Sequence, residues 1–442
     1  MSESAYVIHP VLNLGQKKQS DKRSVEDELA EITSLVSAID LEVCASESLN
    51  IQKPSPSHLL GKGTVERIAE NCAELKPDVV IINHALSPVQ QRNLERAIKC
   101  KVIDRTGLIL EIFGERASTK EGRIQVELAA LEYQKSRLVR SWTHLERQRG
   151  GAGFMGGPGE TQIEIDRRLI ADRITSLKKQ LESVKKTRDL GRKARERVPF
   201  PIIALVGYTN AGKSTLFNTL TKADVMAEDM LFATLDPTMR KLELPNGQSV
   251  ILADTVGFIS DLPTSLIAAF RSTLEQVQYA DIILHVRDIA REDTEAQKQD
   301  VIDVMNDLDI DYEADKRVIE VWNKIDTLDE EDKDSALSAA QRKKHIEAVS
   351  AITGEGLNNL LNTLSEKLNH LQVEHWFYVS HDKGEALSWL YEHGGVIERE
   401  DRMEDVAIHV KLAADEMSRF ITHFDIHPAT EEDRDTHVIN LD

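Results

Sequence analysis

The stretch that decides the fold is PIIALVGYTNAGKSTLFNTL, from Pro201 to Leu220. Its apolar run from Ile202 to Val206 predicts a buried strand, and the residues from Lys213 onward predict a helix. Between them lies the pattern G-x-x-x-x-G-K-S, whose backbone N–H groups cradle phosphates, while Lys213 adds positive charge and Ser214 offers a hydroxyl to Mg²⁺. Because strand, loop and helix follow in the order that a phosphate loop needs, we predict an α/β fold built on a P-loop domain, a mostly parallel sheet with helices on both faces.

Three motifs downstream of this loop specify the nucleotide. The strand in VILADTVG ends at Asp254, whose carboxylate can hold Mg²⁺ through water, and the amide of Gly257 can sense the terminal phosphate. A later strand ends in NKID, where Asp326 would accept hydrogen bonds from both N1–H and N2–H₂ of guanine. Adenine lacks both donors and would leave that buried carboxylate unpaired, which discriminates strongly. Ser350 and Ala351 follow a further strand, where the base could rest, so the ordered motifs predict a GTPase.

The residues after Gly257 bear on the rate of hydrolysis. Many small GTPases carry a glutamine close to this point, which orients the attacking water. Here Phe258 and Ile259 follow, and neither can position or deprotonate a water molecule. We therefore expect slow hydrolysis by the isolated protein and stimulation by a partner.

A second glycine-rich stretch, GGAGFMGGPGE from Gly150 to Glu160, competes for the phosphate. Gly151, Gly153 and Gly156 match the dinucleotide-binding pattern G-x-G-x-x-G. That pattern requires a strand directly before it, whereas the charged helical segment RSWTHLERQR precedes this loop. We therefore assign phosphate binding to the later loop.

The earlier loop lies between two segments with helical periodicity. Residues recur at alternating steps of four and three on both sides, which predicts an antiparallel helical hairpin with the loop at its tip. The recurring residues are Ile124, Leu128, Leu131, Lys135, Leu138, Trp142 and Leu145 before the loop, and Ile170, Ile174, Leu177, Leu181 and Val184 after it.

The hairpin is the basic part of an acidic chain. Glu111–Phe200 contains 20 Lys and Arg against 13 Asp and Glu, although the whole chain has a formal net charge of −20. A basic stem with a tip poor in side chains suits close approach to an RNA backbone, and Phe154 could stack on a base. The alternative is a flexible turn without further function. The expected RNA contacts are Arg149, Gly151, Gly153, Phe154, Met155, Gly156 and Gly157.

The two ends of the chain predict small α/β domains. Strand-like and helix-like segments alternate over the first hundred residues, which indicates a parallel sheet. Within them Gly61–Gly63 precedes a helix and could bind an anion, although such a turn is more often only a loop. From Leu371 to Asp442 there are 6 Lys and Arg against 17 Asp and Glu, which disfavours RNA contact there.

Composition bounds the class of protein. The chain has 442 residues, of which 41% are apolar, and this predicts several soluble domains. No apolar run approaches the roughly 18 residues that a membrane span needs, and the first residues show no signal-peptide pattern. Three isolated cysteines favour reduced thiols in a cytosol. We expect a cytoplasmic monomer without stable membrane insertion, of which a fraction could associate peripherally with membranes.

The motifs together resemble the Obg–HflX group of translational-factor-class P-loop GTPases, and within it the HflX family. The resemblance covers most of the chain and rests on VIDRTGLILEIFGERASTKEGRIQVELAAL, GGAGFMGGPGETQIEIDRR, GYTNAGKSTLFN, LFATLDPT and DTVGFI. It implies hydrolysis of GTP to GDP and phosphate, and binding to the large (50S) ribosomal subunit and its rRNA. It also implies a role in splitting or rescuing stalled ribosomes under stress, or in ribosome biogenesis.

The resemblance assigns roles to two further residues. Thr234 would be the switch threonine that ligates Mg²⁺ when GTP is bound, with Thr238 as its rival. Asn210 stands where potassium-stimulated GTPases of this class have an asparagine, which implies that K⁺ supplies charge during hydrolysis. The alternative is that Asn210 only shapes the loop.

The expected nucleotide site draws on five segments of the chain. Its catalytic residues would be Lys213 and Gly257, and its metal ligands Ser214 and Thr234, with Asp254 bound to Mg²⁺ through water. The full set of expected nucleotide contacts is Gly207, Tyr208, Thr209, Asn210, Ala211, Gly212, Lys213, Ser214, Thr215, Phe232, Ala233, Thr234, Leu235, Asp236, Asp254, Thr255, Val256, Gly257, Asn323, Lys324, Ile325, Asp326, Ser350, Ala351 and Ile352.

We expect four parts along the chain. These are an N-terminal α/β domain (1–112), the helical hairpin with a basic linker (113–198), the GTPase domain (199–370) and an acidic C-terminal α/β domain (371–442). Two rival functions stay open: an RNA-remodelling ATPase that uses Lys62, and a membrane-associated regulatory GTPase. The segment GKG is short for a nucleotide site, and NKID favours guanine, so a GTPase is the preferred interpretation.

Overall fold

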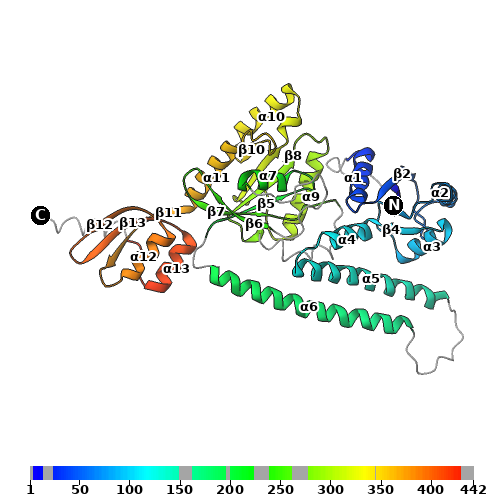
Figure 1. Ribbon diagram of the computed structural model, residues 1–442, viewed down its shortest axis with the longest axis horizontal. Coiled ribbons are helices and arrows are strands. Elements are labelled where there is room, and N and C mark those ends of the chain that lie inside the picture. The colour runs from blue at the N-terminus through cyan, green and yellow to red at the C-terminus, as the bar shows by residue number, and fades with distance from the viewer. Residues whose placement is uncertain are drawn as a thin grey trace. The chain divides into compact units, whose positions relative to one another are not determined.

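The computed structural model describes residues 3–12, 23–148, 162–195, 200–222, 238–260, 277–343 and 345–429. They belong to two compact bodies, whose elements are labelled in Figure 1. The first body comprises Met1–Thr187, Ile202–Lys241 and Leu252–Leu357, and the second comprises Arg188–Pro201, Leu242–Ile251 and Asn358–Asp442. The described helices include none that is both long and apolar enough to cross a membrane.

The chain begins with a four-stranded parallel sheet in the order β2-β1-β3-β4. Its strands are β1 (Ser4–Leu12), β2 (Glu42–Ile51), β3 (Val79–Ile82) and β4 (Lys101–Asp104), and the helices between them are α1 (Val25–Ser37), α2 (Lys62–Leu75) and α3 (Pro88–Ile98). Alternate residues of β3 face opposite sides, because Val79 and Ile81 join one apolar cluster and Val80 and Ile82 join another. The first of these clusters also contains residues of the P-loop domain, among them Val206 and Phe258.

The helix α4 (Arg105–Arg116) begins directly where β4 ends. The side chain of Asp104 accepts a hydrogen bond from the backbone N–H of Gly107 at 2.8 Å, so this carboxylate caps the helix. Asp104 therefore turns the chain from strand to helix at the carboxyl edge of the sheet.

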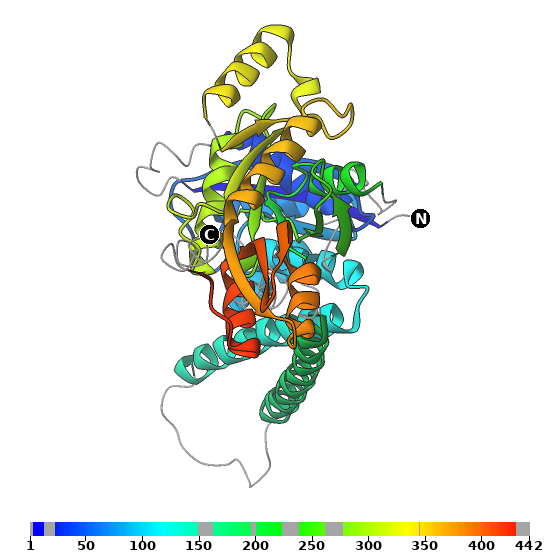
Figure 2. The same cartoon turned by 90° about the vertical axis from the view of Figure 1, so that its left-hand side faces the viewer.

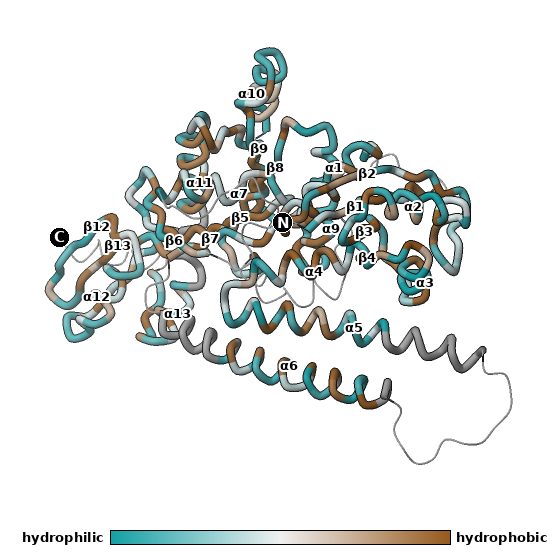
Figure 3. Tube along the Cα trace, turned by 45° about the vertical axis from the view of Figure 1, so that its right-hand side comes forward, coloured by the Kyte–Doolittle hydropathy of each residue, from teal (hydrophilic) through white to brown (hydrophobic). Residues whose placement is uncertain are grey.

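The helices α5 (Lys120–Gln148) and α6 (Gln162–Arg195) form the long antiparallel hairpin seen in Figures 1 and 2. Their seam is apolar, and brown and teal alternate along the coloured parts of both helices in Figure 3. Its buried residues are Ile124, Leu128, Ile174 and Leu177, flanked by Leu131, Ile170, Leu181 and Val184. The sequence periodicity thus identified the packed face of α6 from Ile170 to Val184 and that of α5 as far as Leu131. Lys135 is not part of the apolar seam, and the side chains of Leu138, Trp142 and Leu145 lie outside the described part of the chain.

A six-stranded sheet in the order β10-β9-β8-β5-β7-β6 carries the GTPase motifs. The strands β5, β8, β9 and β10 pair in parallel. The elements in chain order are β5 (Ile202–Gly207), α7 (Lys213–Thr221), β6 (Thr238–Glu243), β7 (Ser249–Asp254), β8 (Ile282–Asp288), α9 (Thr294–Asp307), β9 (Val318–Asn323), the short 3₁₀ helix η2 (Ile325–Thr327), α10 (Glu330–Arg342), β10 (Ile346–Ala348) and α11 (Leu357–Leu371).

The chain ends in a three-stranded antiparallel sheet in the order β11-β13-β12. Its elements are β11 (Gln372–Ser380), α12 (Gly384–His393), β12 (Gly395–Asp401), β13 (Asp405–Ala413) and α13 (Ala414–Phe424). Phe377, Leu390, Ile408 and Phe420 form its core, so this part buries apolar side chains of its own.

The predicted fold class is confirmed: a P-loop α/β domain preceded by a small α/β domain and a helical hairpin, and followed by a small α/β domain. One local expectation was wrong. The basic segment expected as a linker is helical as far as Arg195, since its Lys, Arg, Leu and Ala residues all favour helix.

Candidate nucleotide-binding site

The phosphate loop connects β5 to α7 at the carboxyl edge of the parallel strands. Gly212 precedes α7 with a φ of +88°, and a Cβ built there would lie 2.2 Å from Nδ2 of Asn323. Only glycine fits such a position. The first backbone N–H groups of a helix have no intrahelical acceptor, so the start of α7 suits an anion.

Lys213 is the first residue of α7 and is only 6% exposed. Its Nζ donates hydrogen bonds to the carbonyl oxygens of Gly207 at 3.1 Å and Tyr208 at 2.8 Å. Burial lowers the pKa of Lys213 to about 8, against the opposing effect of the Asp254 carboxylate. A phosphate bound at this point would stabilise the ammonium form of Lys213. Anion binding and protonation of Lys213 would therefore favour each other.

Ser214 and Asp254 come from α7 and β7 and meet at the site. The Ser214 hydroxyl donates to Oδ2 of Asp254 at 2.8 Å, and Asp254 is fully buried. Hydroxyl and carboxylate oxygens, completed by nucleotide phosphates and water, are the ligands that Mg²⁺ prefers. The donor set therefore fits the magnesium ion that GTPases generally use.

Gly257 packs directly against the phosphate loop. The Phe258 N–H donates to the Gly207 carbonyl at 3.1 Å, and the Thr209 N–H donates to the Phe258 carbonyl at 2.7 Å. A Cβ built at Gly257 would lie 2.8 Å from Cγ2 of Thr209 and 3.0 Å from Nζ of Lys213. Glycine at this position brings the DTVG backbone next to the lysine, where the terminal phosphate is expected.

Asn323 links the phosphate loop to the expected base site. Its Nδ2 donates to the Ala211 carbonyl at 2.9 Å, and its Oδ1 accepts from the Ala351 N–H at 3.0 Å. Asn323 is 1% exposed, so both bonds are shielded from water. One amide side chain thus fixes three segments that are far apart in sequence.

Asp326 has the free acceptor that guanine recognition needs. Its Oδ1 is buried and has no hydrogen-bond partner in the structure. A buried acceptor without a partner is costly, and the N1–H and N2–H₂ donors of guanine would satisfy it. Nearby, Ser350 and Ala351 are buried, whereas Ile352 is 75% exposed. Lys324 pairs with Asp288 at 2.8 Å, which holds the motif at the end of β9.

Several expected site residues lie outside the described part of the chain. These are Phe232 to Asp236, including Thr234, and the tip residues Arg149, Gly151, Gly153, Phe154, Met155, Gly156 and Gly157. Thr238 begins β6, and Asn210 is exposed in the loop with a φ of +60°. The assignments of Thr234, of K⁺ at Asn210 and of RNA at the tip stay predictions.

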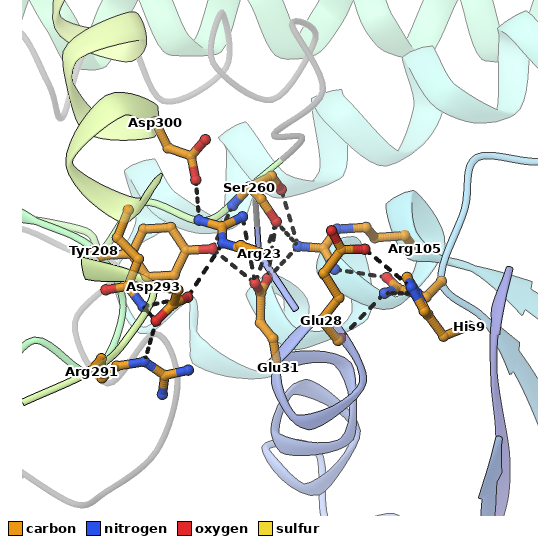
Figure 4. Close-up of polar contacts among 12 residues, drawn as sticks. His9, Arg23, Glu28, Glu31, Arg105, Tyr208, Ser260, Arg291, Asp293 and Asp300 are labelled. Carbon is orange, nitrogen blue, oxygen red and sulfur yellow. Dashed lines mark hydrogen bonds and ion pairs between the residues drawn. The ribbon is translucent and has the colours of Figure 1, made fainter. Parts of the chain in front are cut away.

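The N-terminal domain contributes contacts to this site that sequence reasoning missed. Figure 4 shows Glu31 of α1 and Arg105 of α4 converging on Tyr208 of the phosphate loop and on Ser260. Tyr208 donates from its hydroxyl to Glu31 at 2.9 Å and accepts from the Ser260 N–H at 2.9 Å. Arg105 donates to the Ser260 hydroxyl at 2.8 Å and its carbonyl at 3.1 Å, and it pairs with Glu31.

Arg23 completes this interface on the side of α9. Its guanidinium lies 5.1 Å from the centre of the Tyr208 ring, 3.3 Å from Asp293 and in an ion pair with Asp300. Burial raises the pKa of Tyr208, and the neighbouring Glu31 carboxylate raises it further, so the phenol stays protonated and can donate. The sequence signals are Tyr208 in the loop and Arg105 in the stretch VIDRTG, whereas Glu31 lies in no motif.

Family models match four consecutive parts of the chain. Those described as GTP-binding GTPase N-terminal and GTP-binding GTPase Middle Region match residues 26–114 and 116–195. The model described as 50S ribosome-binding GTPase matches residues 202–324, and the HflX C-terminal domain matches residues 335–433. The GTPase HflX of Magnetococcus marinus is 49% identical over 385 residues, which cover 87% of this chain and 88% of the relative. This chain belongs to the HflX family.

Other HflX proteins agree with this placement. The GTPase HflX of Escherichia coli is 43% identical over 388 residues, covering 87% of this chain and 89% of the relative. Among solved structures, the GDP complex of SsGBP is similar with a TM-score of 0.48 and 23% identity, over 84% of this chain and 99% of that one. As a member of the HflX family with a matching GTP-binding domain, the chain is a GTPase that hydrolyses GTP.

Proposed function

We propose that this HflX-family GTPase acts on the large ribosomal subunit, and that the nucleotide at its phosphate loop sets how the hairpin and N-terminal domain meet ribosomal RNA. The description of the matching family model as a 50S ribosome-binding GTPase supports the partner. The basic hairpin supports the contact, since Arg167 and Arg168 are exposed on α6 close to the tip. The proposal places the protein in the cytoplasm, where it would split or rescue stalled ribosomes or assist their assembly.

The observation that carries the coupling is the pair Asp104 and Arg105. Arg105 donates to Ser260, three residues after Gly257, as Figure 4 shows. Its neighbour Asp104 accepts from the Tyr133 hydroxyl at 2.6 Å and from Arg137 at 3.2 Å, and both of these residues belong to α5 of the hairpin. Two adjacent residues thus contact the DTVGFIS segment and the hairpin stem, so movement of one reaches the other through a single rigid turn.

Hydrolysis would use the groups gathered at the loop. Lys213 and the loop N–H groups would stabilise the charge that develops on the terminal phosphate. The Gly257 N–H would donate a hydrogen bond to this phosphate when GTP is bound. Ser214 would ligate Mg²⁺ directly and Asp254 through water, and the ion when bound would neutralise charge on the β- and γ-phosphate oxygens. K⁺ held at Asn210 would supply further positive charge during hydrolysis. The absence of a water-orienting side chain at Phe258 and Ile259 supports slow turnover until the ribosome assists.

Shortening the tip from Gly151 to Gly159 tests the ribosomal half of the proposal. GTP turnover is measured with and without purified large subunits, for the natural chain and the shortened one. We expect large subunits to raise turnover at least about tenfold, since partners complete GTPase sites, and shortening to remove most of this stimulation while basal turnover stays unchanged. Equal stimulation of both chains would contradict a role for the tip, and no stimulation of either would contradict the ribosomal partner.

Ser260→Ala and Arg105→Lys test the coupling. Each weakens the Arg105–Ser260 contact, the first by removing the hydroxyl and the second by losing the two-pronged guanidinium while keeping the charge. In a pelleting assay, we expect the natural chain to bind ribosomes more tightly with a GTP analogue than with GDP, and both variants to lose most of that difference. Arg67→Lys is the matched control, because Arg67 pairs with Glu47 at 2.8 Å and is partly exposed. A full nucleotide preference in both variants would rule out this route of coupling.

A further inference from the structure

Thr209, in the middle of the phosphate loop, has a hydroxyl group that forms no hydrogen bond in the structure. The residue is 5% exposed, and its Oγ1 is buried without a hydrogen-bond partner. Its backbone N–H already donates to the Phe258 carbonyl at 2.7 Å, and this bond could form with any side chain at the position. The backbone therefore does not account for the presence of a hydroxyl group at residue 209. A buried hydroxyl without a partner costs free energy, and valine would fill the same space at no such cost.

The side chain of Thr209 lies at the terminal-phosphate end of the site. Its Cγ2 would be 2.8 Å, and its Cα 3.0 Å, from a Cβ built at Gly257, and the same Cβ would be 3.0 Å from Nζ of Lys213. The hydroxyl is bonded to the same carbon as this methyl group, so rotation about the Cα–Cβ bond would bring it toward the place where Lys213 meets Gly257. Those two residues are the ones expected to contact the γ-phosphate.

The same place lacks a side chain to hold the attacking water. Phe258 and Ile259, which follow Gly257, are apolar and each 1% exposed. Thr255, the other hydroxyl residue of the DTVG segment, donates to the Leu205 carbonyl at 2.6 Å inside the sheet. Of the side chains described around Gly257, Thr209 is the one that brings an unused donor and acceptor.

We propose that the Thr209 hydroxyl donates to a γ-phosphate oxygen of GTP and accepts a hydrogen bond from the attacking water, which it thereby positions. In the step itself, the water oxygen forms a bond to the γ-phosphorus and the bond to the β–γ bridging oxygen breaks. GDP leaves with the electron pair, and the protons of the water pass to the phosphate and the solvent. The inference rests on the proposed assignment of the Gly207–Ser214 loop as the phosphate site. It assigns to the Thr209 hydroxyl a contact with the γ-phosphate, which GTP has and GDP lacks.

The test compares Thr209→Val, which keeps the shape and loses the hydroxyl, with Thr209→Ser, which keeps the hydroxyl. Single-turnover GTP hydrolysis and GDP affinity are measured for the full chain without ribosomes. Thr221→Val is the matched control, because the Thr221 hydroxyl donates within α7 to the Phe217 carbonyl at 2.7 Å. We expect Thr209→Val to lower the hydrolysis rate about 10- to 100-fold, and Thr209→Ser and the control to stay within about threefold of the natural chain. GDP affinity should be unchanged in all of them.

Two results would overturn the inference. One is hydrolysis by Thr209→Val at the natural rate. The other is a parallel loss of GDP affinity and hydrolysis in Thr209→Val, which would mean that the residue only shapes the loop. Lys213→Ala, measured alongside, distinguishes failure of the proposed phosphate site from both, because only that failure would leave its GDP affinity and hydrolysis at the natural level.

Discussion

Lys213→Ala is expected to lower kcat/KM for GTP by about a thousandfold or more, because the variant loses the buried ammonium that stabilises the transferring phosphate. In the structure this ammonium donates hydrogen bonds to the carbonyl oxygens of Gly207 and Tyr208. Lys213 is the one lysine or arginine within Gly207–Ser214, and Lys324, which approaches the loop at Gly212, is already paired with Asp288. Steady-state phosphate release and binding of a fluorescent GTP analogue would measure the effect.

Lys62→Ala is the matched control for this change. The Lys62 side chain is 93% exposed and lies 3.9 Å from Glu66, its neighbour on the same helix. We expect the Lys62 variant to hydrolyse GTP at the natural rate. ATP hydrolysis that survives Lys213→Ala and disappears in Lys62→Ala would instead support the rival interpretation, a remodelling ATPase with its site in the N-terminal domain.

Asp326→Asn is expected to lower GTP affinity by about a hundredfold or more and to create affinity for xanthosine triphosphate. The buried Oδ1 of Asp326 has no protein partner, so the guanine donors are what would satisfy it. Asparagine would place an N–H₂ group opposite the guanine amine and leave donors facing each other. Xanthine has a carbonyl oxygen in place of that amine and would accept the hydrogen bond. Competition of both nucleotides against labelled GDP measures the exchange of preference.

Asp334→Asn makes the same chemical change at an exposed position of α10. The control should keep the natural preference for GTP. If Asp326→Asn also kept it, the guanine would have to be recognised elsewhere, and the assignment of NKID as the base motif would be wrong.

The sequence predicted those features that depend on neighbouring residues. The strand, loop and helix around Lys213 follow from local pattern, and the seam of the hairpin follows from the spacing of Ile124, Leu128, Ile174 and Leu177. The strand β2 escaped prediction because most of its residues alternate between exposed and half-buried positions. Its sequence carries few large apolar residues, and pairing with β1 fixes it rather than any local preference.

The contacts between domains could not be predicted. Glu31 meets Tyr208 across 177 positions of sequence, and Arg105 meets Ser260 across 155. Although Tyr208 and Arg105 lie in stretches that the sequence analysis singled out, nothing local to those stretches indicates which distant residues they contact. Asp326 and Thr209 illustrate the reverse case: their positions in the motifs were predicted, but the unpartnered oxygen atoms became visible only in three dimensions.

The apolar cluster that contains Val7 and Ile81 of the first sheet also contains Val206 and Phe258 beside the phosphate loop. Heat or denaturant should therefore melt the N-terminal and GTPase domains in one cooperative transition, since neither can lose its packing while the other keeps it. A chain trimmed to its GTPase domain would expose to water the apolar residues that pack against the N-terminal domain in the intact chain. Such a fragment would tend to aggregate. GTP turnover measured on such a fragment would therefore differ from that of the intact chain.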